Sequence, residues 1–284
     1  CGAAARALIA EAGLNLKVAV ISGDDLLDAR DGFTDKKDMF SGADCPPPEA
    51  LASVNAYLGG FPVAAALDAG ADIVITGRSV DSAVTLGACI HAFGWQAADL
   101  DKLAAGSLAG HIIECGPQAS GGNFTDWQLS GDIADIGYPF IDIDGDGVFT
   151  VSKPEGTGGV VNVGTVSEQM LYEIGDPQAY LLPDVACDFA HVTIEETAPN
   201  QVRVANAKGT TPPDSYKVCA TFADGFRAGT MMSFVGIDAA AKASHFADAA
   251  FARARAVLRQ HNLADYDETS VEVLGDDSQF GDAG

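Results

Sequence analysis

The residues best suited to chemistry are carboxylates, a thiol and an arginine that follow short apolar runs in the first half of the chain. Carboxylates transfer protons in general acid–base catalysis, a cysteine thiolate attacks carbonyl carbon, and a guanidinium group holds a carboxylate through paired hydrogen bonds. These chemistries indicate four candidate catalytic residues: Asp24, Asp25, Glu114 and Cys115.

A glycine-rich loop, GPQASGGN at 116–123, follows the candidate thiol directly. Its glycines and small side chains leave backbone N–H groups able to approach an anion closely, as in phosphate-binding loops. The spacing matches neither GxGxxG nor GxxxxGKS/T, so it does not indicate a nucleotide cofactor. With the arginine included as a carboxylate ligand, the candidate substrate-binding residues are Arg78, Asp81, Gln118, Gly121, Gly122 and Asn123.

Structural interpretations of the same residues stand beside these functional ones. Asp24 and Asp25 are equally suited to capping the turn that follows a strand, and Asp81 is suited to capping a helix. Cys115 also fits a buried structural cysteine, which is the commoner role of a lone cysteine.

The histidines do not support a metal site or a thiol–imidazole pair. All five are scattered, without HExxH or paired cysteines, so no metal is predicted. If 111–116 is a strand, His111 and Cys115 share one face but stand about 13 Å apart at about 3.3 Å per residue.

Short apolar runs are expected to position the candidates: LKVAVIS at 16–22, DIVITG at 72–77 and HIIECG at 111–116. Their composition is typical of buried parallel strands, and helical patterns occur at 3–12, 49–58, 62–70, 81–93 and 99–106. Ligands bind beyond the carboxyl ends of such strands, so Asp24, Arg78 and Glu114 are expected to face one crevice. We therefore predict an α/β parallel-sheet layer, incomplete at its N-terminus, as a domain over residues 1–131.

From residue 132 the pattern changes to alternating strands. GYPFIDIDGDGVFTVSKP is typical of a hairpin whose turn is DGDG at 144–147. It also imitates the start of a calcium loop, but Lys153 stands where a bidentate Glu is needed, which favours the hairpin. Residues 160–175 are expected to carry a strand into a short helix. A domain over 132–284 is predicted as an α+β layer, with strands at 191–197, 201–209, 215–225, 227–236 and 269–275 and one long C-terminal helix at 238–261.

Composition excludes several classes of partner. The chain has 40 acidic and 16 basic residues and a net charge of -24, so nucleic acid and anionic membrane surfaces are disfavoured. Six cysteines without a CxxC pair, and no long apolar run or signal peptide, predict a reduced cytoplasmic protein. The chain opens on Cys1 without a methionine, so we expect a fragment of a longer protein.

Several motifs, in order, resemble the acyclic terpene utilisation (AtuA) family: KVAVISGDDL, ITGRSVDSA, FGW, GHIIECGPQASGGN, GYPF, SKPEGTGG, SEQMLYEIGDPQAYLLPDVACDF and YKVCATFADGFR. The similarity covers essentially the whole chain. Members are encoded beside acyl-CoA dehydrogenases, a biotin-dependent acyl-CoA carboxylase and enoyl-CoA hydratases that degrade citronellol and geraniol. The resemblance also implies that an N-terminal segment with its own glycine-rich loop, and residues beyond Gly284, are missing.

The resemblance implies an enzyme of branched isoprenoid acid catabolism that acts on an acyl-CoA or a carboxylate. Arg78 would hold a carboxylate, the 116–123 loop would receive a phosphate or an oxyanion, and one of the candidate carboxylates would transfer a proton. The alternatives are a non-catalytic subunit or scaffold for the pathway's carboxylase or dehydrogenases, and a small-ligand binding protein that is stabilised by its ligand without turnover. The expected partners are a small-molecule substrate and either a second copy of the chain or a pathway enzyme; no cofactor and no reaction class follow from the residues.

Overall fold

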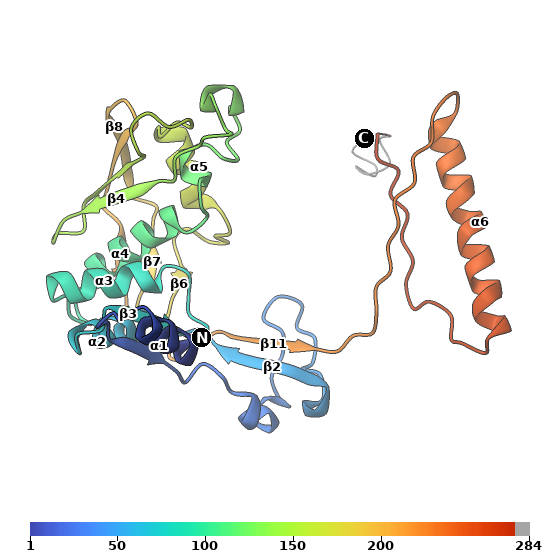
Figure 1. Cartoon of the computed structure of the whole chain (residues 1–284), viewed down its shortest axis with the longest axis horizontal. Helices are drawn as coiled ribbons and strands as arrows, with labels where there is room; N and C mark the ends of the chain where they lie inside the picture. The colour runs from blue at the N-terminus through green and yellow to red at the C-terminus, as the bar shows by residue number, and fades with distance from the viewer. Residues whose placement is uncertain (276–284) are drawn as a thin grey trace. The chain divides into compact units, whose positions relative to one another are not determined.

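The computed structural model describes residues 1–275, and it shows a mixed α/β chain with several small sheets (Figure 1). The chain divides into two compact units, Cys1–Ala223 and Asp224–Gly284. The α-helices are α1 (Gly2–Glu11), α2 (Phe61–Asp68), α3 (Ala83–Phe93), α4 (Leu100–Ile113), α5 (Val163–Leu171) and α6 (Ala239–Gln260). The strands are β1 (Val18–Ile21), β2 (Leu51–Ala56), β3 (Ile73–Thr76), β4 (Phe140–Ile143), β5 (Phe149–Ser152), β6 (Tyr180–Leu181), β7 (Ala186–Asp188), β8 (Thr193–Ala198), β9 (Gln201–Ala205), β10 (Lys208–Thr210) and β11 (Val218–Phe222).

A parallel pair of strands, β1 and β3, underlies the first part of the chain. Val18 pairs with Ile73 and Ile21 pairs with Thr76, so both strands end at the same edge. The crossover between them includes α2, which packs on both strands. The runs predicted at 16–22 and 72–77 are confirmed as parallel strands, and their common direction brings the residues that follow them together.

The segment at 49–58 is not the helix that its apolar spacing predicted. It forms β2, which pairs antiparallel with β11, with Val54 opposite Ala220. The pairing partner lies far along the chain, so a local pattern could not indicate it. Tertiary strand pairing overrides helical spacing here.

The prediction of a strand at 111–116 is also wrong, because α4 continues through Gly106 to Ile113. Gly106 packs so closely on Trp95 and Leu86 that a Cβ would lie 2.9 Å from each, and Gly110 packs equally closely on Ser82. These glycines therefore mark the close approach of neighbouring segments and not the end of a helix. His111 consequently lies in the last turn of α4.

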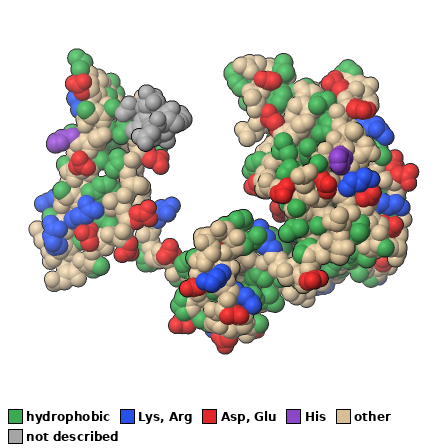
Figure 2. Space-filling view, turned by 180° about the vertical axis from the view of Figure 1, so that it is seen from behind, with side chains coloured by type: hydrophobic (Ala, Val, Ile, Leu, Met, Phe, Trp, Pro, Cys, Tyr) green, Lys and Arg blue, Asp and Glu red, His purple; other side chains and the backbone are tan. Residues whose placement is uncertain are grey.

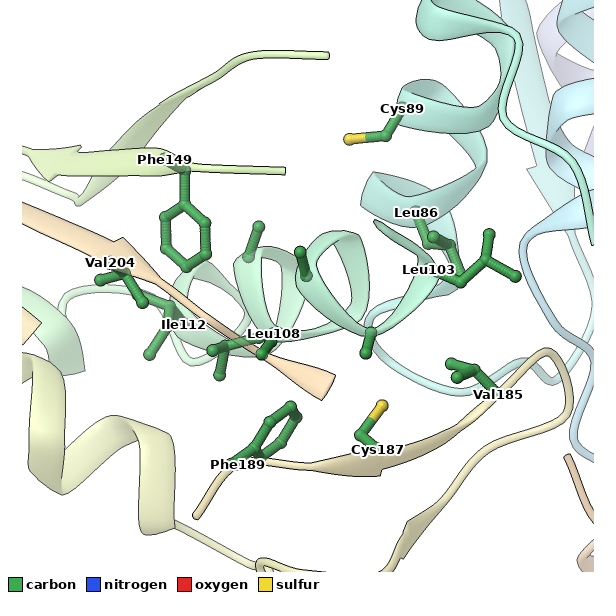
Figure 3. Close-up of a cluster of buried hydrophobic side chains, with 14 of the residues drawn as sticks. Leu86, Cys89, Leu103, Leu108, Ile112, Phe149, Val185, Cys187, Phe189 and Val204 are labelled. Atoms are coloured by element: carbon green, nitrogen blue, oxygen red, sulfur yellow. The ribbon is translucent and has the colours of Figure 1, made fainter. Parts of the chain in front are cut away.

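The hydrophobic core surrounds α4 (Figure 3). This helix is buried continuously from Leu103 to Ile112 and packs against α3, α5 and strands of the second half of the chain. Each fully buried leucine in it contributes roughly 1.5–3 kcal/mol to folding. Figure 3 shows the side chains that meet here: Leu86, Cys89, Leu103, Leu108, Ile112, Phe149, Val185, Cys187, Phe189 and Val204. This core joins elements on both sides of residue 131. The domain boundary at 131/132 and the arrangement into an α/β layer and an α+β layer stay predictions.

An antiparallel sheet in the order β4-β5-β9-β8 carries the predicted hairpin. The turn places Gly147 at φ 83°, and the Asp144 side chain accepts the N–H groups of Asp146 and Val148, so this carboxylate serves the turn. Residues 160–161 form no strand with any described residue, but the helix expected after them is α5, which begins with a capping box of Asn162 and Thr165.

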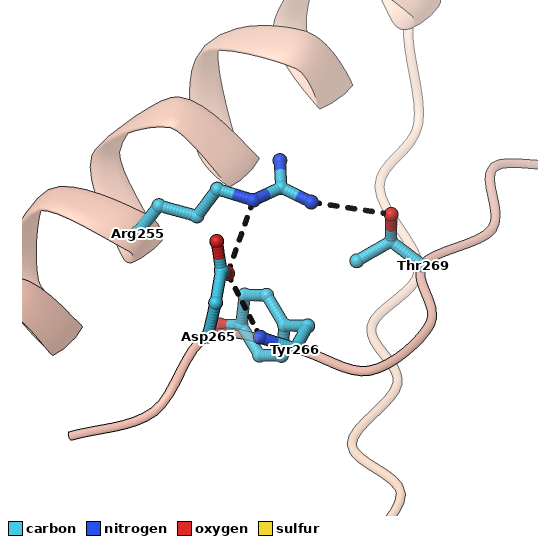
Figure 4. A network of polar contacts seen from close by, with 4 residues as sticks. All are labelled: Arg255, Asp265, Tyr266 and Thr269. Atoms are coloured by element: carbon cyan, nitrogen blue, oxygen red, sulfur yellow. Dashed lines mark hydrogen bonds and ion pairs between the residues drawn. The ribbon is translucent and has the colours of Figure 1, made fainter.

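The unit from Asp224 onwards contains the predicted long helix, α6 (Figure 1). The strands expected at 227–236 and 269–275 are not formed among the described residues. A polar network holds the segment after α6 to the helix: Arg255 Nε donates to Asp265 Oδ1 at 3.2 Å, and its Nη2 lies 3.5 Å from Thr269 Oγ1 (Figure 4). Arg255 and Asp265 thus form an ion pair at the surface.

Candidate functional site

The carboxyl ends of β1 and β3 bring Asp24 and Arg78 together, as the parallel arrangement predicted. The Arg78 N–H donates to Asp24 Oδ2 at 2.8 Å, and Asn55 Nδ2 donates to the same oxygen at 3.1 Å. The Arg78 N–H is the largest of the causes that lower the pKa of Asp24. Gly77 fits against this carboxylate, because a Cβ there would collide with it. Asp24 is therefore an ionised acceptor that fastens the two strand ends.

Beyond these strand ends lies a shallow, polar hollow of about 400 Å³. The guanidinium-bearing Arg78 is exposed at its wall, so its side chain is accessible to a ligand. The lining residues are Asp24, Asn55, Gly77, Arg78, Ser79 and Asp81.

A second hollow of about 370 Å³ adjoins the first through Asp81, which lines both. Its walls come from α3, from the segment after α4 and from the segment after α5. The lining residues are Asp81, Val84, Glu114, Cys115 and Glu173. Asp81 therefore stands between a cationic side chain in one hollow and two further carboxylates in the other.

Asp81 is the carboxyl group of the site whose pKa is raised. Partial burial is the largest cause, followed by the charges of Glu114 and Glu173, while Arg78 acts in the opposite direction. A side-chain hydrogen bond with Glu114 raises the pKa further. The raised pKa of Asp81 means that its protonated form is favoured more than that of an isolated aspartate.

His111 connects this pair to the core. Its Nδ1 lies 3.2 Å from Glu114 Oε1, and its backbone carbonyl accepts a 2.8 Å hydrogen bond from Gln169 Nε2. The imidazole is buried, and among residues 1–275 its Nε2 has no hydrogen-bond partner. The position of Glu114 is thus set by a residue that sequence reasoning had considered only beside the thiol.

Cys115 lines the second hollow with the properties of a protonated thiol. Its Sγ lies 3.7 Å from Glu114 Oε1. Burial first, and then the charge of Glu114, raises the pKa of the Cys115 thiol. A nucleophilic cysteine needs the opposite, a cationic environment that lowers its pKa. The structural interpretation of Cys115 is favoured.

The remaining predicted residues do not join the two hollows. Asp25 accepts the Leu27 N–H at 3.0 Å and so caps a turn, in keeping with the capping interpretation. Within the glycine-rich loop, four backbone N–H groups donate to nearby carbonyl groups between Cys115 and Gln118. These N–H groups belong to Gln118, Ser120, Gly121 and Gly122. The expected anion nest is therefore not formed by these groups.

The loop's own geometry explains this outcome. Gly121 has φ 96° and packs against Ser130, whose hydroxyl donates to the Gly121 carbonyl at 2.9 Å. Asn123 is exposed and lines neither hollow. These glycines serve tight turns and close packing, which the composition alone does not distinguish from anion binding.

Two residues that line the hollows, Glu173 and Asn55, were not predicted from the sequence. Glu173 adopts φ 58°, which is uncommon for a residue with a side chain and is retained when its surroundings hold it. No sequence signal indicates this conformation, although the position directly after a helix pattern is a usual place for it. Asn55 was hidden within the segment expected to be helical.

On the face shown in Figure 2, acidic side chains are spread over the molecule with basic ones between them. No group of three or more His, Cys, Asp or Glu side chains within residues 1–275 is arranged to hold a metal ion. Among the helices of that same range, none is both long and apolar enough to cross a bilayer.

A family model, acyclic terpene utilisation family protein AtuA, matches residues 1–283. The chain belongs to the AtuA family. This confirms the resemblance read from the ordered motifs and connects the protein with acyclic terpene utilisation. No curated protein and no solved structure gives a significant match. The family match covers both compact units, so its motifs extend well beyond the two hollows.

Proposed function

We propose that this AtuA family member is an enzyme of acyclic terpene catabolism that transfers a proton on a branched acyl-CoA or free carboxylate. The observation that carries the proposal is the position of Asp81, which lines both hollows. A ligand spanning them would contact a cation at one end and a carboxyl pair at the other. That combination suits a substrate with an anionic group and an acidic C–H bond next to its carbonyl.

In this proposal each side chain has one role. Arg78, exposed at the wall of the first hollow, binds the anionic part of the substrate. Asp81, with its raised pKa, holds the proton to be delivered, and Glu114 accepts the proton that is removed. His111 positions Glu114, and Asp24 holds the strand ends in place.

We also propose that the protein works in the cytoplasm. All six cysteines are free thiols, which is the usual state in a reducing compartment. The net charge of -24 supports a small-molecule substrate over nucleic acid.

The test is hydrogen exchange into the substrate. Citronellyl-CoA and citronellic acid, which carry C–H bonds on a saturated carbon next to the carbonyl, are incubated with the protein in deuterated water and followed by NMR. Deuterium should enter next to the carbonyl, and Asp81→Asn should slow the exchange about 100-fold. Asp25→Asn, which alters an exposed carboxylate outside the hollows, is the matched control. Absence of exchange and of calorimetric binding across the panel would overturn the proposal.

A second function is favoured by one observation. Large apolar side chains between residues 226 and 237 are highly exposed: Phe226, Met231, Val235 and Ile237. Exposed apolar clusters often mark protein contacts. We infer as the alternative a non-catalytic subunit that contacts a pathway enzyme or a second copy through this segment. Co-purification lost in a Phe226→Ser/Val235→Ser variant, without any turnover by the protein alone, would support it.

A further inference from the structure

Two cationic side chains converge on one aromatic ring beside the first hollow. Arg78 Cζ lies 5.5 Å from the ring centroid of Tyr57, and Lys217 Nζ lies 5.2 Å from it. Neither cation forms an ion pair with a carboxylate anywhere in residues 1–275. The chain has 16 basic and 40 acidic residues, so two basic side chains at one ring without a carboxylate partner among the described residues are unusual in it.

The backbone fixes this arrangement. The Tyr57 N–H donates to the Lys217 carbonyl at 3.0 Å, in continuation of the antiparallel pairing of β2 with β11. On the other side, the Leu58 N–H donates to the Arg78 carbonyl at 3.1 Å, and Leu58 bridges to Ser79 in parallel register. Tyr57 is thus held between the two chain segments that carry the cations, and the backbone brings both segments to the ring.

The charges around this ring leave room for an anion. Arg78 and Lys217 both carry a positive charge at the Tyr57 ring, and the face of the ring compensates for these charges only in part. The carboxylates that line the first hollow with Arg78 are Asp24 and Asp81. Asp24 is already engaged by Asn55 and by the Arg78 N–H, and Asp81 is paired with Glu114. An external anion bound beside the ring would be attracted by both positive charges.

The donor groups indicate which anion fits. A guanidinium offers planar paired donors and an ammonium offers three more on a flexible stem. Together they match a group with two negative charges and several acceptor oxygens better than a single carboxylate, whose two oxygens one guanidinium satisfies.

We propose that Arg78, Tyr57 and Lys217 form a binding site for a phosphate group of the ligand. The proposal rests on the proposed function in one respect, that Arg78 contacts the anionic part of the substrate, and it goes further by adding Lys217 and Tyr57 and by naming the anion. A phosphate at this position belongs either to a phosphate-bearing thioester or to a separate phosphate ester.

Calorimetric titration of the full chain with pyrophosphate, inorganic phosphate and acetate, at constant ionic strength, tests the site. Both phosphates should bind more tightly than acetate. Lys217→Gln should weaken phosphate binding about tenfold, and Lys217→Arg should restore it. Lys242→Gln removes the same charge from an exposed position on α6 and should have no effect. Equal binding of acetate, or unchanged phosphate binding in Lys217→Gln, would overturn the proposal.

The same variants separate the sources of the phosphate and the two proposals. If the substrate is an acyl-CoA, Lys217→Gln should raise its KM about tenfold while the KM of the free acid stays unchanged. If phosphate binds but no terpenoid acid or thioester exchanges deuterium, the site stands and the proposed function fails. If exchange occurs and is independent of Lys217, with no phosphate binding, the proposed function stands and the phosphate site is wrong.

Discussion

His111 Nδ1 lies 3.2 Å from Glu114 Oε1, three residues further along the chain, where α4 ends. The imidazole is buried, whereas the carboxylate reaches the second hollow. Glu114 is therefore positioned by the buried imidazole of His111, which does not line the hollow. This relationship makes the orientation of the proposed base depend on the core packing around α4.

The first prediction is that His111 and Glu114 are energetically coupled. His111→Phe removes the ring nitrogen beside Glu114 and should lower the free energy of unfolding by about 1–3 kcal/mol, because a buried polar partner is lost. A double-mutant cycle with Glu114→Gln in urea should give a coupling energy of about 0.5–3 kcal/mol. A coupling within about 0.3 kcal/mol of zero would show that the two residues act independently.

The second prediction concerns the pH dependence of stability at Asp81. The folded pKa of Asp81 is raised, so the protonated form favours the folded state, and this contribution is lost as the pH rises from the ordinary aspartate pKa of 3.8 through the folded pKa. Asp81→Asn should therefore unfold at higher urea concentration than wild type near neutral pH. The gain should be less than about 1 kcal/mol because the side chain is partly solvated, and it should vanish at pH values below the ordinary aspartate pKa. A loss of stability at neutral pH would contradict this.

The third prediction is that the contribution of Asp24 to stability depends on pH in the opposite direction to that of Asp81. The folded pKa of Asp24 is lowered, chiefly by the Arg78 N–H, so its contribution is present above the ordinary aspartate pKa of 3.8 and is lost as the pH falls through the folded pKa. Asp24→Asn should cost about 1 kcal/mol near neutral pH and progressively less in acid. Asp25→Asn is the matched control, since that carboxylate only caps the Leu27 turn. Equal effects of the two variants would remove the special role of Asp24.

The strands on which this site rests were predictable because each is one continuous, β-branched run. The pattern at 16–22 and at 72–77 sufficed to place Asp24 beside Arg78, since a helical crossover requires parallel strands. The pattern at 49–58 failed because β2 is defined by its pairing with β11, far along the chain. Asn55 and the Tyr57–Lys217 contact depend on that pairing, so sequence reasoning missed them together.

The wrong prediction of a strand at 111–116 is explained by the packing of glycines in α4. Glycine inside an apolar run was interpreted as the end of a helix, yet Gly106 and Gly110 are the points where α4 approaches its neighbours closely. His111 was consequently assigned to a strand, and its proximity to Glu114 was hidden. In the 116–123 loop the composition was right for an anion nest, but the directions of the N–H groups depend on dihedral angles that composition does not fix.

The fourth prediction is that Cys115 is a structural thiol. Because burial holds the pKa of the Cys115 thiol above the ordinary cysteine value of 9.0, fewer than about one molecule in a hundred carries the thiolate at neutral pH. Iodoacetamide should therefore modify Cys115 more slowly than the exposed Cys219, as followed by peptide mass spectrometry, and the rate should rise about tenfold per pH unit towards alkaline pH. Cys115→Ala should retain the deuterium exchange, since the thiol transfers no proton in the proposed reaction. If this variant folds with the wild-type unfolding midpoint and yet exchanges at least about 100-fold more slowly, the thiol takes part in the chemistry and the division of roles between Asp81 and Glu114 must be revised.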